Sequence, residues 1–237
     1  MTKNYVVVGG LSGIGQSIVD SLSCDTTSSI IATTRTPDES RVHNSNVSVL
    51  QLDLLDTISI DRFIHSVTSE FPCIDGLVLC AGFIQTSPAL MASQSLIFDH
   101  LQVNFVSQLQ ILQFLVRKRM LRNKSGSIVY ISSSAEKHAN AGRLAYAASK
   151  AAMSTSMRVL SRELASHGLR FNCVLPGITE SKLMRNSTSP SDIDNYIKSI
   201  DNKKLADPSE IAPIVSFLLS DSSTHITGQC ISVDGGI

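Results

Sequence analysis

A tyrosine and a lysine stand four residues apart in the segment Tyr146-Ala-Ala-Ser-Lys150. In a helix this spacing places both side chains on one face, about one turn apart. The lysine cation favours the phenolate, so we expect it to lower the tyrosine pKa towards the range useful for acid–base catalysis. Ser133 lies thirteen residues upstream of Tyr146, after an apolar run, and can hydrogen-bond a substrate oxygen. Together these residues predict proton transfer at a carbonyl or alcohol group.

A glycine-rich segment, Val8-Gly-Gly-Leu-Ser-Gly-Ile-Gly15, follows the first strand-like run and precedes a helical pattern. Glycine permits a tight turn and a close approach of the backbone to phosphate, and the N-terminus of the next helix attracts an anion. An ordinary glycine-rich turn has the same composition, so the motif alone is a weak signal. The residues predicted to form a dinucleotide cradle are Gly9, Ser12, Gly13, Ile14 and Gly15.

The second strand-like run ends at Thr33-Thr34-Arg35, where no acidic residue is present to accept a ribose 2′-hydroxyl. Arg35 can instead bind a 2′-phosphate, which favours NADP(H) over NAD(H); the alternative is an ordinary solvated arginine. Asp53, just after the third run, is predicted either to accept a hydrogen bond from the adenine amino group or to cap a helix. Further predicted cofactor contacts are Leu54, Ala81 and Gly82.

The composition fits one α/β domain over residues 1–237, with 43% hydrophobic residues and a net charge of zero. The balanced charge gives no attraction to nucleic acid or to an anionic membrane, and no apolar run reaches transmembrane length. The five cysteines are scattered, and the chain enters a strand too early for a signal peptide, so we expect a cytoplasmic protein. The six histidines show no ligand spacing, and we expect no metal site.

Short β-branched runs alternate with helical patterns, which predicts a doubly wound parallel sheet with right-handed crossovers. The predicted strands are Tyr5–Val8, Ser29–Thr33, Val47–Leu52, Gly76–Cys80, Ser127–Ile131, Leu169–Val174 and Cys230–Val233. The predicted helices are Ile14–Leu22, Ile58–Phe71 (with Asp56 or Thr57 as N-cap), Leu96–Arg122, Ala145–His167 and Pro208–Leu219. Residues 36–46 are expected to form a loop or a short helix. The polar stretch 181–204 is expected to be a mobile substrate loop.

From about Tyr5 to Gly236 the chain resembles the short-chain dehydrogenase/reductase family. The glycine segment resembles the TGxxxGxG motif, and Leu79-Cys-Ala-Gly82 stands where the family has NNAG. The segments Asn172-Cys-Val-Leu-Pro-Gly177 and Gly228-Gln-Cys-Ile-Ser-Val-Asp-Gly-Gly236 resemble two further family segments. The residues that match the catalytic tetrad in order and spacing are Asn104, Ser133, Tyr146 and Lys150. Each motif alone has an ordinary structural explanation, and their collinear order carries the resemblance.

The resemblance implies a seven-stranded Rossmann sheet and hydride transfer between the nicotinamide C4 and a substrate carbon. It implies that Tyr146 exchanges the proton, Ser133 orients the carbonyl and Lys150 holds the nicotinamide ribose. It also implies that Asn104 supports a proton relay through water. Pro176, Gly177, Ile178 and Ser181 are implied cofactor contacts, the backbone near Ile178 facing the carboxamide. Many members of the family are tetramers packed through two long helices, so we expect a homo-oligomer, either a tetramer or a dimer.

Three residues depart from the family pattern around the cradle. Val8 replaces a threonine whose hydroxyl ties the cradle to the loop after the fourth strand. Leu79 and Cys80 replace both asparagines of NNAG. Because both sites lose polar groups in one neighbourhood, we expect apolar packing to compensate and the cradle to be rearranged but competent.

The layout is similar to that of 3-oxoacyl-acyl-carrier-protein reductases, which implies a small-molecule or acyl-thioester carbonyl substrate and an acidic carrier protein as a partner. Lys124 and His167 occupy positions that are basic in that subgroup. Other basic residues close by in the sequence are Arg117, Lys118, Arg119 and Arg122. A solvated helix end explains the same cluster. The alternatives are a reductase or dehydrogenase of a secondary-metabolite, sugar-derived or steroid-like ketone, and a non-catalytic dinucleotide-binding sensor.

Overall fold

Seven short strands, each rich in β-branched and other apolar residues, form one parallel sheet in the order β3-β2-β1-β4-β5-β6-β7. The computed structural model describes residues 2–36, 44–138 and 140–237. The strands are β1 (Asn4–Val8), β2 (Ser29–Thr34), β3 (Val47–Gln51), β4 (Gly76–Leu79), β5 (Gly126–Ile131), β6 (Leu169–Pro176) and β7 (Cys230–Val233). The predicted doubly wound sheet is therefore confirmed, and most strand ends agree within one residue.

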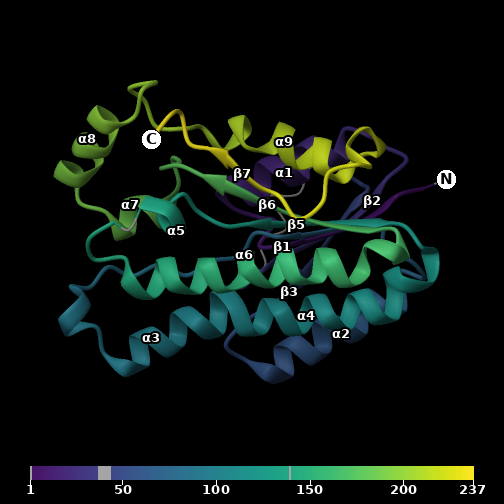
Figure 1. Ribbon diagram of the computed structural model, residues 1–237. Coiled ribbons are helices and arrows are strands. Elements are labelled where there is room, and N and C mark those ends of the chain that lie inside the picture. The colour runs from purple at the N-terminus through teal and green to yellow at the C-terminus, as the bar shows by residue number, and fades with distance from the viewer. Residues whose placement is uncertain (1, 37–43, 139) are drawn as a thin grey trace.

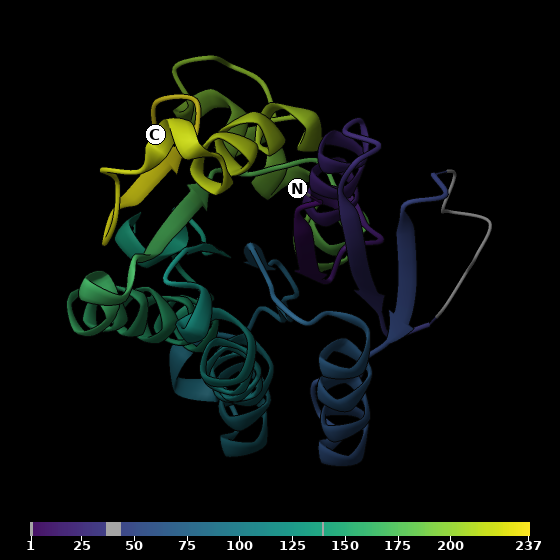
Figure 2. The ribbon, with the colours of Figure 1, turned by 90° about the vertical axis from the view of Figure 1, so that its right-hand side faces the viewer.

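Helices cover both faces of the sheet (Figures 1 and 2). One face carries α1 (Gly13–Ser23) and α9 (Ala212–Leu219), and the other carries α2 (Thr57–Glu70), α4 (Ser107–Leu115) and α6 (Leu144–Leu164). Successive side chains of a strand point to opposite faces, so Val6 and Val8 of β1 join one apolar cluster while Tyr5 and Val7 join the other. The sheet is thus buried on both sides.

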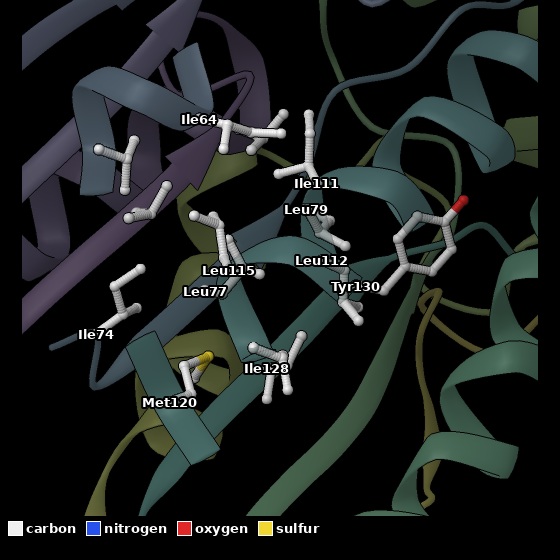
Figure 3. Close-up of a cluster of buried hydrophobic side chains, with 14 of the residues drawn as sticks. Ile64, Ile74, Leu77, Leu79, Ile111, Leu112, Leu115, Met120, Ile128 and Tyr130 are labelled. Atoms are coloured by element: carbon white, nitrogen blue, oxygen red, sulfur yellow. The ribbon is translucent and has the colours of Figure 1, made fainter. Parts of the chain in front are cut away.

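The larger cluster fills the space between the sheet and α2, α4 and α6 (Figure 3). Leu77 and Leu79 of β4 and Ile128 of β5 meet Ile111 and Leu112 of α4, and all five are fully buried. Tyr130 is the largest fully buried side chain. Its ring lies at the border of this cluster, and its hydroxyl points away from the cluster (Figure 3).

The predicted helix Leu96–Arg122 is not continuous. It consists of α3 (Gln94–Leu101), a π-helical turn η3 (Gln102–Val106), α4, a second π turn η4 (Val116–Met120) and a 3₁₀ turn η5 (Leu121–Asn123). A π turn admits one extra residue and locally rotates the side chains that follow it. The first π turn contains Asn104, which is fully buried. Sequence periodicity alone does not reveal such a turn.

The other predicted helices are confirmed with small changes. Asp56 is the N-cap of α2, since its Oδ1 accepts the backbone N–H of Ile58 at 2.9 Å. The predicted helix Ala145–His167 corresponds to α6 followed by a 3₁₀ turn, η6 (Ala165–His167). The remaining short elements are α5 (Ala135–His138), η2 (Ala89–Met91), η7 (Pro208–Glu210), which precedes α9, and η8 (Asp221–Ser223).

The stretch 181–204, predicted to be a substrate loop, contains two helices. They are α7 (Lys182–Ser187) and α8 (Pro190–Ser199), and Figure 1 shows both at the end of the sheet where α5 lies. Ser181 and Ser189 cap them through their side-chain oxygens, and Pro190 occupies the first turn of α8, where proline is favoured. Of the predicted loop 36–46, residues 37–43 lie outside the described part of the chain.

Within the described ranges, every helix is too short or too polar to cross a membrane.

The apolar layer between the sheet and α2 predicts that two isoleucines of α2 contribute very differently to the free energy of unfolding. Ile60 is fully buried in the larger cluster, whereas Ile58 is 61% exposed. Ile60→Ala should lower the free energy of unfolding by about 2–5 kcal/mol, because it removes buried methyl groups and leaves a cavity. The matched change Ile58→Ala should alter it by less than about 0.5 kcal/mol. Urea denaturation of the three proteins measures both values; equal losses would contradict this description of the core.

Candidate active site

The predicted site residues follow the carboxyl ends of adjacent strands. All strands are parallel, so the segments after β1, β4, β5 and β6 emerge at the same edge of the sheet. These segments carry the glycine-rich turn, Ala81 and Gly82, Ser133, and the stretch Gly177–Ile178. A methyl group built on Gly82 would lie 3.7 Å from Lys150 Nζ and 3.8 Å from Asn104 Oδ1. Gly82 therefore lies at the centre of the group.

The glycine-rich turn is closed by contacts that only glycine allows. Gly9 has φ = +82°, and a Cβ there would lie 2.7 Å from the Ala81 backbone. A Cβ on Gly15 would lie 2.0 Å from the carbonyl oxygen of Gly9. The turn leads directly into α1, whose capping residue Ser12 makes no side-chain cap hydrogen bond. Small residues, a tight turn and a free helix N-terminus fit the pyrophosphate of a dinucleotide.

The departures at Val8, Leu79 and Cys80 are compensated in two ways. The Thr33 hydroxyl of β2 accepts the Gly9 backbone N–H at 2.9 Å, and the Val8 carbonyl accepts the N–H groups of Cys80 and Ala81, both at 2.9 Å. The backbone thus joins the cradle to the loop after β4 without the family threonine. Val8 and Leu79 are fully buried in the same cluster, which agrees with the expected apolar packing. Burial raises the pKa of the Cys80 thiol to about 12.

Lys150 is a buried cation that lies beside two tyrosines. Its side chain is 3% exposed, and its Nζ donates a hydrogen bond to the Ile131 carbonyl at 2.8 Å. The Nζ lies 4.9 Å from the ring centroid of Tyr130 and 5.8 Å from that of Tyr146. Burial lowers the pKa of Lys150 to about 8. The helical spacing therefore places Lys150 and Tyr146 together, as the sequence predicts.

The pKa of Tyr146 differs from the expectation. Burial raises it, although a hydrogen bond with Ser133 and the charge of Arg143 act in the opposite direction. The net shift of the Tyr146 pKa is therefore upward, opposite to the expected lowering, and burial keeps the phenol protonated.

Asn104 uses its whole side chain to fix the loop after β4. Its Oδ1 accepts the Phe83 backbone N–H at 2.8 Å, and its Nδ2 donates to the Phe83 carbonyl at 2.9 Å and to Ser149 Oγ at 3.0 Å. The Asn104 backbone carbonyl accepts the Tyr130 hydroxyl at 3.2 Å. The side chain thus joins the π turn to that loop and to α6.

Sequence reasoning missed His100. This fully buried residue of α3 donates from Nδ1 to the Leu96 carbonyl at 2.8 Å and accepts the Gln85 backbone N–H at Nε2 at 3.1 Å. Burial lowers its pKa, so the ring is neutral at pH 7. Its centroid lies 6.4 Å from that of Tyr146. A histidine within an amphipathic helical pattern carries no signal of this placement.

The remaining predicted residues lie around the same edge. Ser133 is partly buried and caps the start of α5, because its Oγ accepts the Ala135 N–H at 3.2 Å. Ser181 faces the cradle, since a methyl group on Gly13 would lie 3.4 Å from its Cβ. The carbonyls of Pro176 and Ile178 accept the N–H groups of Ser134 and Ala206.

The adenine side of the predicted site is more open. Arg35 is exposed at the end of β2. One carboxylate oxygen of Asp53 accepts the Leu55 N–H at 2.9 Å, so Asp53 closes a turn, while Asp56 caps α2. Leu54 is buried, and its carbonyl accepts the Ser107 hydroxyl at 2.5 Å. Asp53 therefore keeps one oxygen for another donor.

The basic residues Lys124 and His167 lie at the amino ends of the strands, whereas Tyr146 and Lys150 lie near the carboxyl ends. Lys124 precedes β5 and His167 precedes β6, and a Cβ on Gly168 would lie 2.0 Å from the Lys124 carbonyl oxygen. Ser133 follows β5 nine residues after Lys124, which corresponds to roughly 20–30 Å along the strand direction. Arg119 donates to the Thr68 carbonyl of α2 at 2.5 Å, which is a structural contact. Within one chain Lys124 and His167 are therefore remote from Ser133, Tyr146 and Lys150.

A family model described as enoyl-(acyl carrier protein) reductase matches residues 9–237. The uncharacterized oxidoreductase YmfI of Bacillus subtilis is 30% identical over 244 residues, covering 100% of this chain and 99% of that protein. The 3-oxoacyl-acyl-carrier-protein reductase FabG of Escherichia coli is 28% identical over 238 residues, covering 99% and 97%. A crystal structure of a short chain dehydrogenase family protein from Francisella tularensis superposes with a TM-score of 0.90 at 26% identity, covering 99% and 98%.

The buried ammonium predicts that Lys150→Met stabilises the protein without bound cofactor. Below pH 8 the folded protein bears the full cost of burying the charge. The ordinary pKa of a lysine is 10.5. Between pH 8 and 10.5 the folded protein binds fewer protons than the unfolded chain, so its stability rises with pH. At pH 7 the variant should be more stable by about 1–3 kcal/mol, allowing for the lost hydrogen bond. The difference should narrow between pH 8 and 9.5.

Urea denaturation at several pH values measures this difference, and Lys182→Met supplies the same substitution at an exposed lysine. A less stable Lys150→Met protein at pH 7, or a difference that is constant with pH, would contradict the description of Lys150 as a desolvated cation.

Proposed function

The chain belongs to the short-chain dehydrogenase/reductase family, whose members are oxidoreductases that use NAD(P), and on this premise we propose that it interconverts a ketone and a secondary alcohol with NADP(H). The observation that carries the proposal is the contact of Lys150 with Tyr146 beside Ser133 at the carboxyl edge of the sheet. A non-catalytic dinucleotide sensor would not require a buried cation beside a phenol, and burying that cation costs stability.

A dinucleotide bound at this edge would be held by the chain in three places. The turn Gly9–Gly15 and the N-terminus of α1 would take the pyrophosphate, and Asp53 and Arg35 would meet the adenosine half. Lys150, Ser181 and the segment Pro176–Ile178 would meet the nicotinamide half. When bound, the nicotinamide supplies the carbon that gives or takes the hydride.

The chain's own residues would manage the proton. In reduction, Tyr146 donates its hydroxyl proton to the substrate oxygen, and Ser133 Oγ donates a hydrogen bond to the same oxygen. The raised pKa of Tyr146 keeps that proton available at neutral pH. Lys150, whose Nζ lies 5.8 Å from the Tyr146 ring centroid, would stabilise the phenolate that remains once the ammonium turns from the Ile131 carbonyl. We also propose that the Asn104 carbonyl, which binds the Tyr130 hydroxyl, accepts the water of the relay.

The acyl-thioester substrate rests on the relatives. Those named 3-oxoacyl-acyl-carrier-protein reductase are 28–29% identical and match nearly the whole chain, which supports a 3-oxoacyl thioester as the first substrate to test. Docking of an acidic carrier protein on Lys124 and His167 would need a second chain, because these residues are remote from the site of their own chain. Exposed Val106 and Val159 on the long helical segments support a homo-oligomer, a tetramer or a dimer.

The first experiment follows the loss of NADPH absorbance, with NADH in parallel, using the N-acetylcysteamine thioester of acetoacetate as substrate. Fast oxidation of NADPH alone supports both the cofactor and the thioester. Binding of NADPH without turnover of this thioester moves the search to secondary-metabolite, sugar-derived or steroid-like ketones. Binding without turnover of any ketone favours the sensor.

Replacing Tyr146 by phenylalanine tests the proposed acid. The substitution removes the hydroxyl and keeps the ring, so kcat should fall by roughly 100-fold or more while the Kd for NADPH stays within about twofold. Tyr5 lies near the amino end of β1, away from the carboxyl ends of the strands. Tyr5→Phe is therefore the matched control and should leave kcat unchanged. Turnover that survives in Tyr146→Phe would rule out this residue as the proton donor.

Replacing Arg35 by alanine tests the cofactor preference. If the guanidinium binds the 2′-phosphate, the Kd for NADPH should rise by about 10- to 100-fold and that for NADH should not change. Arg62→Ala removes the same charge from the exposed face of α2 and should affect neither. Equal weakening of both cofactors, or of neither, would refute the role of Arg35. Titration calorimetry gives all the constants.

A further inference from the structure

A cavity of about 340 Å³ lies between the segment just before α6 and the helices α7 and α8. Its walls come from three segments: the loop after β4, the residues just before α6, and the helices α7 and α8. The lining is mostly polar and includes Thr86, Asn140, Arg143, Thr188, Asp192 and Tyr196. Arg143 stands three residues before Tyr146, and its charge acts on the Tyr146 phenol, so it links the cavity to the proposed proton donor. A cavity of this size is at the lower end of those that hold small molecules.

Arg143 is a buried cation with spare hydrogen-bonding capacity. The residue is 8% exposed, and its Nη2 donates to the Ser187 carbonyl at 3.2 Å and to Thr188 Oγ1 at 2.7 Å. Its Nη1 is buried and has no partner. None of the ion pairs among the described residues includes Arg143. Burying a guanidinium group without a counter-ion is costly, so the position calls for an anion from outside the chain.

The neighbouring groups leave the guanidinium charge unbalanced. Asp192 is the one carboxylate among the described lining residues, and its Oδ2 accepts the Ser189 hydroxyl at 2.7 Å. Burial lowers the pKa of His100 and raises that of Tyr146, and the charge of Arg143 acts in the lowering direction on both. The field of Arg143 therefore reaches the proposed proton donor.

We propose that Arg143 is a specificity-determining residue that binds the carboxylate of a small oxo-acid substrate in this cavity. The planar guanidinium suits a carboxylate, and Arg143 lines the cavity with its Nη1 unpaired. Because Arg143 stands less than one helical turn before Tyr146, we expect the carboxylate and the reacting carbonyl to be few bonds apart. The inference rests on the proposed ketone chemistry and narrows its substrate to an anion, in place of a neutral thioester.

A structural role for Arg143 is the rival explanation. Its contacts with Ser187 and Thr188 hold the link between α7 and α8, and the Thr86 hydroxyl donates to the same Ser187 carbonyl at 2.8 Å. A residue that only fixes these helices would affect charged and neutral ligands alike. The test therefore compares ligands that differ only in charge.

Calorimetric titration of the full chain with acetoacetate, with methyl acetoacetate and with the neutral N-acetylcysteamine thioester supplies that comparison. NADP⁺ is added to saturation, so that the ketone binds without being reduced, and the titrations are repeated without cofactor. We expect acetoacetate to bind about 10- to 100-fold more tightly than either neutral ligand. Arg143→Gln should remove this preference and leave the neutral ligands within about twofold, while Arg143→Lys should restore part of it.

Two further variants complete the design. Arg185→Gln removes an equal charge from exposed α7 and should leave the preference intact. Asp192→Asn removes the carboxylate that would compete with the ligand for Arg143. It should tighten the binding of acetoacetate and leave the binding of the neutral ligands unchanged. Equal binding of the three ligands, undetectable binding of acetoacetate, or equal weakening of all ligands in Arg143→Gln would overturn the proposal. Because the titrations without cofactor report on anion binding alone, a failure of the NADP(H) proposal remains distinguishable from a failure of this one.

Discussion

The hydrogen bond from the buried ammonium of Lys150 to the Ile131 carbonyl is the interaction on which the site depends. An ammonium group that is almost wholly removed from water must find an acceptor, and here the acceptor is the last residue of β5. This bond fixes α6 against the carboxyl edge of the sheet. The helix in turn places Tyr146 one turn away and next to Ser133. The arrangement requires a buried charge, and burying that charge lowers the stability of the fold.

The second requirement is a rigid loop after β4, since this loop faces both the cradle and the catalytic residues. Three buried groups hold it from the helical side. Asn104 fixes Phe83, His100 accepts from Gln85, and Gln108 Nε2 donates to the Ala81 carbonyl at 2.9 Å. All three come from the segment around the π turn η3, which rotates successive side chains into the site. The π turn η3 thus connects the long helical segment from α3 to α4 to the carboxyl edge of the sheet.

The interior of the site is electropositive. Lys150 and Arg143 are both buried and neither forms an ion pair with a carboxylate among the described residues. Such a field favours the phenolate of Tyr146, a developing alkoxide and an anionic substrate, because all three carry negative charge. Burial of Tyr146 opposes this effect and keeps the phenol protonated before reaction. The balance between the two therefore depends on what fills the cavity beneath α7 and α8.

The sequence by itself determined the sheet, the cradle and the spacing of Ser133, Tyr146 and Lys150, because these are read from local periodicity and from residues a turn apart. It missed the π turn at Asn104, the helices α7 and α8 and the position of His100. The direction of the strands places Lys124 and His167 at the amino ends of β5 and β6, which the residue types alone do not show. Only the tertiary structure decided which side chains are desolvated, and desolvation controls the pKa values of Tyr146 and Lys150 and the unpaired charge of Arg143. Burial depends on contacts between residues remote in the chain, and no local pattern records it.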